Sequence, residues 1–231
     1  MWYLSVCVHP QLIGSDARIQ RAVQVDRSKH KVLGRMKSTN QLKIDRTIAL
    51  VGLMGAGKSA IGHRLGVRLG LKFVDADVEI EASAGKTITE IFGLHGEDAF
   101  RKCERRVIKQ LLAGPVCVLA TGGGAFIDSK TRFVIREQAL SIWLRADLET
   151  LYRRVLRRDG RPLLAAGDPR KILATLIKRR YPIYGLADIV VDSGDGSHDE
   201  MVNQVITRIA QYNRLHRIES DSDGRAKEAP E

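Results

Sequence analysis

TIALVGLMGAGKS, residues 47–59, is an apolar run followed by a glycine-rich segment that ends in Lys-Ser. Its last eight residues match the Walker A pattern G-x-x-x-x-G-K-[ST], in which backbone N–H groups point at phosphate oxygens. That pattern works between a buried strand and a helix, and residues 58–69 supply the helix because apolar side chains recur every four positions. This context disfavours a chance match in an irregular coil. The stretch predicts a strand, a phosphate-binding loop and a helix.

Each polar or small residue of this loop has an expected task. Gly55 and Gly57 permit positive φ and close approach of a phosphate to the backbone. Lys58 should reach the terminal phosphates as a point charge, and the Ser59 hydroxyl should ligate magnesium. We therefore expect a polyphosphate with its magnesium ion as ligand.

The composition bounds the class of protein. The 231 residues are 44% hydrophobic, which is enough for one domain with a sizeable core. The net charge of +11 leaves open nucleic acid, an acidic membrane or small polyanionic substrates. Aromatic residues make up only 5%, which disfavours a stacking platform for single-stranded nucleic acid. Three cysteines without C-x-x-C spacing suggest a reducing cytoplasm, and no apolar run approaches the ~18 residues of a membrane span.

The chain divides into three parts by pattern. Residues 1–43 show no sustained periodicity and are basic, so we expect an N-terminal extension outside the fold. A start at Met36 or an organelle targeting segment are alternative explanations for residues 1–35. Residues 44–213 should form the folded domain, and the polar residues 214–231 should form a disordered tail.

Short apolar runs alternate with helical patterns from residue 47 onward. The expected strands are 47–52, 71–74, 116–120, 141–144 and 188–191. The expected helices are 58–69, 87–112, 148–157, 169–181 and 198–213. Such alternation is typical of a parallel sheet between two layers of helices. The predicted fold class is therefore α/β, a three-layer α/β/α P-loop NTPase fold with a five-stranded parallel sheet.

Two carboxylates follow the second strand, at the sheet edge where ligands bind in open α/β folds. In extended backbone Asp75 and Asp77 would point the same way, so one could lie near magnesium and the other near a substrate hydroxyl. The alternative is a polar strand exit with Asp77 capping the next helix. The third strand ends in Thr121, where many P-loop proteins carry the Walker B aspartate, so Asp75 is the best candidate for the metal-side carboxylate.

Glycines and arginines complete the candidate site. Residues 122–124 are three successive glycines, which let a ligand lie against bare main chain, although a flexible turn is the plain alternative. Arg101 and Glu104 are three apart on one helix face, so Glu104 could hold the guanidinium in a fixed pose. A Gly and a Pro interrupt a cluster of arginines, which suggests a mobile lid over phosphates or, alternatively, an RNA-binding patch. The cluster comprises Arg153, Arg154, Arg157, Arg158 and Arg161.

The motifs GLMGAGKS, DAD, FRKCE, TGGG, RPLL and RYPIY occur in this order between residues 47 and 191. Each is weak alone, but six in order are specific, and together they resemble shikimate kinase. The resemblance implies Mg²⁺-dependent transfer of phosphate from ATP to the 3-hydroxyl of shikimate, in the pathway to chorismate and the aromatic amino acids. It also implies a monomer in the cytoplasm, with no nucleic-acid or membrane partner.

The resemblance carries roles to individual positions. Asp77 would bind the shikimate hydroxyls as base or orienting group, and Gly123 would contact the substrate through its main-chain N–H. Arg101 and Arg180 would bind the shikimate carboxylate, whose planar shape suits forked guanidinium donors. Asp75 would act on magnesium through water, and Phe92 would wall the pocket. Arg161 of the lid would join Lys58 in neutralising the γ-phosphate. The expected ATP contacts are Gly55, Ala56, Gly57, Lys58, Ser59, Ala60 and Arg161.

Some assignments stay open at this stage. The arginine that stacks on adenine could be Arg154, Arg157 or Arg158, and Tyr184 of the RYPIY motif receives no catalytic role. Another P-loop small-molecule kinase, such as a gluconate kinase, is the nearest alternative, although it should lack the combination of DAD, FRKCE and triple glycine. A P-loop switch or a basic nucleic-acid-binding module is a second alternative, but no N-K-x-D guanine-reading segment is present.

Overall fold

The computed structural model describes residues 42, 44–157, 168–194 and 196–226, with side chains as far as His216. The predicted N-terminal extension, apart from residue 42, and the part of the predicted lid from residue 158 onward, with Arg158 and Arg161, lie outside the described residues. The strands are β1 Thr47–Val51, β2 Lys72–Asp75, β3 Cys117–Ala120, β4 Ala139–Arg145 and β5 Ile189–Asp192. The helices are α1 Lys58–Leu69, α2 Ala76–Ala84, α3 Ile88–Leu112, α4 Ser129–Gln138, α5 Leu148–Leu156, α6 Pro169–Tyr184 and α7 His198–Ala226.

The five strands form one parallel sheet, as the sequence predicts, and their order is β2-β3-β1-β4-β5. All five residues of β1 are buried. Because successive side chains of a strand point to opposite faces, β1 must be covered on both faces. The apolar run TIALV is thus a central strand of an α/β fold.

Helices α1, α2, α4 and α7 pack directly against strands of the sheet. Helix α1 packs against β2, β3 and α7, and α7 in turn packs against β5. Helix α4 packs against β4 and α3, while α5 lies against α6. Gly62 and Gly66 allow α1 to lie close to the chain around β2. A Cβ at Gly62 would lie 2.6 Å from the Phe73 ring, and a Cβ at Gly66 would lie 2.8 Å from the Leu71 carbonyl oxygen. The Walker A helix is therefore fixed firmly above β2.

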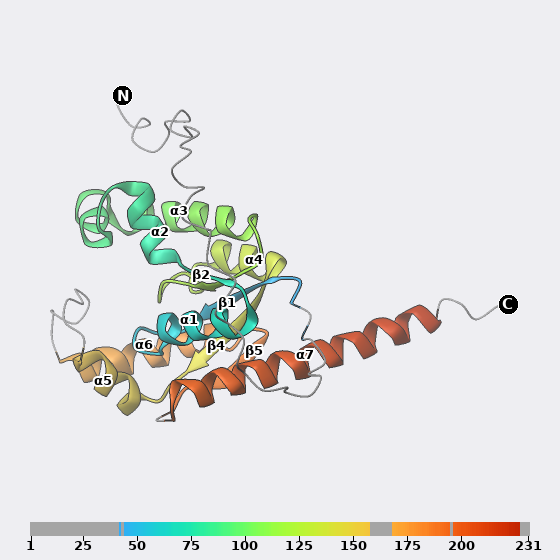
Figure 1. Cartoon of the computed structure of the whole chain (residues 1–231). Helices are drawn as coiled ribbons and strands as arrows, with labels where there is room; N and C mark the ends of the chain where they lie inside the picture. The colour runs from blue at the N-terminus through green and yellow to red at the C-terminus, as the bar shows by residue number, and fades with distance from the viewer. Residues whose placement is uncertain (1–41, 43, 158–167, 195, 227–231) are drawn as a thin grey trace, which may run out of the picture. The chain divides into compact units, whose positions relative to one another are not determined.

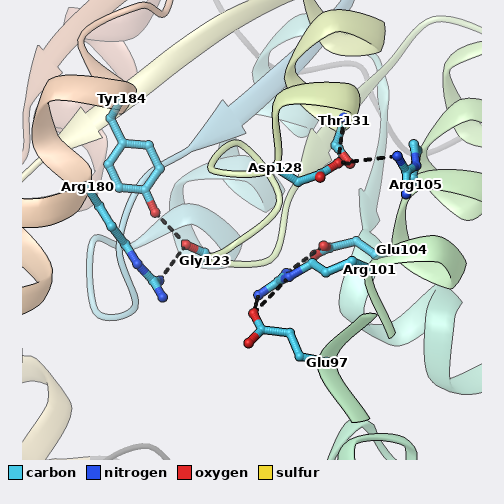
Figure 2. A network of polar contacts seen from close by, with 9 residues as sticks. All are labelled: Glu97, Arg101, Glu104, Arg105, Gly123, Asp128, Thr131, Arg180 and Tyr184. Carbon is cyan, nitrogen blue, oxygen red and sulfur yellow. Dashed lines mark hydrogen bonds and ion pairs between the residues drawn. The ribbon is translucent and has the colours of Figure 1, made fainter. Parts of the chain in front are cut away.

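Two helices were not predicted from the sequence. Helix α2 is short and starts immediately after β2, and helix α4 contains mostly polar residues. Neither helix therefore shows a long run of apolar residues on one face. Side-chain caps define both starts: Asp75 accepts a hydrogen bond from the Asp77 N–H at 3.1 Å, and Asp128 accepts one from the Thr131 N–H at 2.8 Å. Arg105 lies 3.9 Å from Asp128 and ties α4 to α3 (Figure 2).

Three predicted boundaries also change. Gly96 has φ 75° and interrupts α3, which was predicted to be continuous. Helix α6 continues beyond Tyr181 to Tyr184 even though Pro182 lies inside it. Helix α7 continues to Ala226, so the predicted disordered tail is wrong over residues 214–226. The segment holds the helix formers Arg, Leu and Glu, and its first glycine is Gly224, so no stop signal occurs earlier. The C-terminal part of α7 extends away from the sheet (Figure 1).

Candidate active site

The topology brings the predicted motifs to one edge of the sheet. β1 lies between β3 and β4, and β3 lies between β1 and β2. The Walker A loop follows β1, the triple glycine follows β3, and Asp75 ends β2, so these segments meet at the carboxyl ends of adjacent parallel strands. They line a cleft of about 990 Å³.

The Walker A loop has the backbone that an anion site requires. Gly52, Gly55 and Gly57 all have positive φ, at 135°, 82° and 95°. Gly57 is the N-cap of α1 and provides no side-chain hydrogen bond, so the first N–H groups of the helix are not capped by a side chain. These N–H groups and the positive end of the helix dipole favour a phosphate.

Lys58 folds back over this loop. Its Nζ donates hydrogen bonds to the carbonyl oxygens of Gly52 at 2.8 Å and Leu53 at 3.0 Å. The ammonium group therefore lies on the inner side of the loop, among the residues that line the cleft. This is the position from which a point charge can reach terminal phosphates.

The two predicted magnesium-side groups contact each other. Ser59 Oγ donates a hydrogen bond to Asp75 Oδ2 at 2.7 Å, which joins the start of α1 to the end of β2. Thr121, in the place of a Walker B aspartate, is buried and donates to the Leu50 carbonyl oxygen at 3.0 Å. Among the described residues no group of three or more His, Cys, Asp or Glu could enclose a metal. The hydroxyl–carboxylate pair fits magnesium, which keeps several waters and binds mainly through substrate phosphates and one or two protein oxygens.

Asp77 also lines the cleft and lies in the first turn of α2. The backbone is not extended through residues 75–77, and the cap of α2 is Asp75 rather than Asp77, so both sequence-based views of this segment are wrong in detail. Burial raises the pKa of Asp77 above its usual value, and the negative charge of Asp75 raises it further. Lys58 and Arg101 act in the opposite direction. Asp77 is the half-buried acid of the site.

Arg101 is held by two carboxylates of α3 (Figure 2). Its guanidinium donates to Glu104 Oε2 at 2.6 Å and to Glu97 Oε1 at 3.1 Å, which confirms the predicted contact across one helix face. Glu104 is fully buried, and burial raises its pKa, although Arg101 opposes that shift. Burial lowers the pKa of Arg101, but its carboxylate partners outweigh that effect and raise it overall. Arg101 is therefore a rigid cation at the cleft wall.

Arg180 enters the cleft from α6, on the other side of Gly123. Its Nη1 donates to the Gly123 carbonyl oxygen at 3.1 Å. Figure 2 shows the guanidinium groups of Arg101 and Arg180 pointing into the same space below Gly123. Two cations that converge on one space suit a carboxylate or another small anion. Phe92 also lines this end of the cleft, stacked near Phe100 with ring centroids 4.5 Å apart.

The loop after β5 is a part of the site that sequence reasoning missed. Arg154 donates to Ser193 Oγ at 2.9 Å and to the Gly194 carbonyl oxygen, and Ser193 Oγ itself donates to the Ala56 carbonyl oxygen at 3.0 Å. The loop after β5 is therefore hydrogen-bonded to the Walker A segment. No local sequence motif indicates this tertiary contact. Of the other candidate adenine-side arginines, Arg157 lines the cleft, whereas Arg158 lies outside the described residues, as does Arg161 of the predicted phosphate contacts.

Comparisons with known proteins agree on one family. The family model for shikimate kinase matches residues 54–210. A shikimate kinase of Paramagnetospirillum magneticum is 55% identical over 170 residues, which cover 74% of this chain and 87% of that protein. One from Caulobacter vibrioides is 54% identical over 166 residues, covering 72% and 83%.

Solved structures of the same fold include shikimate kinases and a gluconokinase. A shikimate kinase from Acinetobacter baumannii in complex with shikimate superposes with a TM-score of 0.69 at 35% identity, covering 72% of this chain and 93% of that one. A gluconokinase from Sinorhizobium meliloti superposes with a TM-score of 0.54 at 19% identity, covering 76% and 97%, a likeness of fold alone.

Proposed function

The chain belongs to the shikimate kinase family, and we propose that it transfers the γ-phosphoryl group of ATP to the 3-hydroxyl of shikimate. It is an ATP-dependent kinase whose acceptor is a hydroxyl group, and its products are ADP and shikimate 3-phosphate. One observation carries the assignment: a single cleft is lined by the Walker A loop, by the half-buried Asp77 and by two arginines, Arg101 and Arg180. The phosphate donor and a small hydroxylated carboxylate can therefore meet there.

The donor half binds ATP through the loop and α1. The backbone N–H groups of residues 55 and 57–60 surround the phosphates, whereas the N–H of the expected contact Ala56 is used within the loop, where it donates to the Leu53 carbonyl oxygen at 3.2 Å. Lys58 neutralises charge that develops on the transferred group. When bound, Mg²⁺ would lie against Ser59, with Asp75 reaching it through water, and would supply further positive charge to the phosphate oxygens. Arg161 of the lid is proposed to join Lys58, from outside the described residues.

The acceptor half binds shikimate by charge and by hydrogen bonding. Arg101 and Arg180 bind the carboxylate from two sides, and the Gly123 N–H donates to the substrate. Asp77 accepts the hydrogen bond of the 3-hydroxyl and takes its proton as the oxygen attacks phosphorus in line. A raised pKa suits this task, since a base works best when its pKa approaches the working pH.

The two alternatives differ in the ligand they require. A gluconate kinase would share the donor half but would act on an open-chain acceptor. A nucleic-acid-binding module would use its positive charge on phosphate backbones, and its affinity would fall steeply with salt. We favour a cytoplasmic monomer with neither nucleic-acid nor membrane partner. In the part of the chain that the structure describes, no helix combines the length and apolar character that crossing a bilayer requires.

The test is turnover by the purified full-length chain with Mg-ATP. ADP release is followed with shikimate, with gluconate and with no acceptor. We expect release that depends on shikimate and saturates with it, and little with gluconate. Turnover of gluconate in preference to shikimate, or no dependence on shikimate, would refute the proposal.

A further inference from the structure

The carbonyl oxygen of Gly123 accepts two hydrogen bonds from α6 (Figure 2). Arg180 donates one through Nη1 at 3.1 Å, and the Tyr184 hydroxyl donates the other. The two donors are four residues apart, so they lie on the same face of the helix. A carbonyl oxygen has two lone pairs, and both are used here by residues of one helix.

Tyr184 makes this bond from a place that no substrate reaches. Its side chain is fully buried, with ring centroids 5.8 Å from Trp143 and 6.4 Å from Phe126. Burial raises the pKa of Tyr184 to about 12, although Arg180 opposes that shift. The hydroxyl therefore stays protonated at working pH and remains a donor.

The Gly123 segment is held from two sides. On one side it packs against the Walker A backbone, since a Cβ at Gly123 would lie 3.4 Å from the Met54 nitrogen. On the other side it meets Arg180 and Tyr184. When Arg180 turns its guanidinium toward a bound carboxylate, the Tyr184 hydroxyl still satisfies the carbonyl oxygen. Without it, the carbonyl would compete with the substrate for Arg180.

We propose that Tyr184 is a positioning residue for the acceptor substrate: its hydroxyl holds the Gly123 carbonyl so that the Gly123 N–H and the Arg180 guanidinium face shikimate. The inference rests on the proposed function. It concerns one bond, from the Tyr184 hydroxyl to the Gly123 carbonyl, and it assigns Tyr184 no contact with either substrate.

The test uses Tyr184→Phe and a matched control, Tyr181→Phe. Tyr181 belongs to the same helix and the same aromatic cluster, 6.4 Å from Tyr184 between ring centroids, but its hydroxyl donates to the Ala146 carbonyl oxygen. Both variants keep the ring and lose one hydroxyl. For Tyr184→Phe we expect KM for shikimate to rise about tenfold. This is the size of one lost hydrogen bond, after which the Gly123 carbonyl competes with the substrate carboxylate for the Arg180 guanidinium. KM for ATP should stay within about twofold, because the bond that is lost goes to the Gly123 carbonyl oxygen and not to a residue of the Walker A loop.

The readout separates positioning from stability. KM does not depend on the fraction of folded enzyme, so it remains interpretable if Tyr184→Phe is less stable. A thermal melt of both variants shows any loss of stability. Unchanged KM for shikimate in Tyr184→Phe, an equal rise in Tyr181→Phe, or an equal rise for both substrates would overturn the inference. Wild-type turnover of shikimate in the same assay tests the proposed function separately.

Discussion

The sharpest prediction concerns Asp77→Asn, which replaces one carboxylate oxygen by an NH2 group and keeps the shape of the side chain. Asp77 lies in the first turn of α2, near the negative charges of Asp75 and Glu81 and the positive charges of Lys58 and Arg101. The substitution removes the negative charge and the capacity to accept a proton. It leaves the backbone N–H of residue 77 free to keep its hydrogen bond to Asp75.

The predicted loss of activity follows from the role of a base. Positioned general bases contribute about 10² to 10⁴ in rate, which corresponds to about 3–5 kcal/mol of activation free energy. We therefore expect kcat to fall by at least about a hundredfold. The dissociation constant for ATP should change by less than about threefold, because the phosphates are bound by backbone N–H groups and Lys58 rather than by Asp77.

The same substitution should stabilise the fold at neutral pH. The pKa of Asp77 is raised in the folded state, so the folded protein binds more protons than the unfolded chain between the ordinary value of 3.8 and the raised value. Above the raised pKa, the ionised carboxylate therefore opposes folding. The asparagine side chain of the variant has no charge to bury, so the free energy of unfolding should rise by about 0.5–2 kcal/mol. Each kcal/mol raises Tm by roughly 2–4 °C in a domain of this size. Below pH 3.8 the difference should vanish.

Three measurements check this prediction together. Coupled ADP release gives kcat, calorimetric titration with a non-hydrolysable ATP analogue gives nucleotide affinity, and thermal melts between about pH 3.5 and 8, a range chosen around the ordinary carboxyl pKa, give stability. Lost nucleotide binding would mean that Asp77 belongs to the donor half. Near-normal kcat would refute its role as base, and a lower Tm at neutral pH would refute the electrostatic reasoning.

Three further predictions use other residues of the cleft. In Gly124→Ala the new Cβ would overlap the guanidinium of Arg101, so KM for shikimate should rise by about tenfold or more while KM for ATP stays constant. Ser59→Ala removes the hydroxyl that bonds Asp75, and a magnesium titration of kcat should show a midpoint raised by about tenfold; an unchanged midpoint would exclude Ser59 as a ligand. In Asp75→Asn, at saturating magnesium, the acid limb of kcat/KM for shikimate should move to lower pH, because the Asp75 charge raises the pKa of Asp77.

The sequence predicted the parts of the site that depend on local pattern. The Walker A loop needs positive φ at defined glycines, and the sequence predicted this correctly for Gly55 and Gly57, although not for Gly52. Arg101 and Glu104 could be paired because a helix places residues three apart on one face. The central strands β1, β3 and β4 could be recognised because buried parallel strands are nearly continuous apolar runs.

The parts that were missed depend on tertiary contacts. Asp75 caps α2 because the strand turns into a helix within one residue, which no periodicity in so short a segment reveals. Ser193 braces the Walker A loop from 137 residues away in sequence. Tyr184 could be placed in a motif, but its bond to Gly123 depends on α6 continuing past Pro182 to place Arg180 and Tyr184 on one face.

The triple glycine shows how close packing, rather than flexibility, can require this residue. None of Gly122, Gly123 and Gly124 has positive φ, so backbone strain does not explain them. A Cβ at Gly122 would lie 2.7 Å from Asp77 Oδ1 and 2.9 Å from Glu104 Oε1, the buried oxygen that has no hydrogen-bond partner among the described residues. A Cβ at Gly123 would lie 3.4 Å from the Met54 nitrogen, at the edge of ordinary contact, and one at Gly124 would overlap the guanidinium that Glu104 holds. Each glycine thus lies against a different part of the site. Gly122 lies against Asp77 and Glu104, Gly123 against the Walker A backbone, and Gly124 against the Arg101 guanidinium. A flexible turn would need none of these approaches. Substitution at 122 should therefore disturb Asp77 and Glu104 directly, whereas substitution at 124 should displace the Arg101 guanidinium first and reach Glu104 only through the 2.6 Å bond between them.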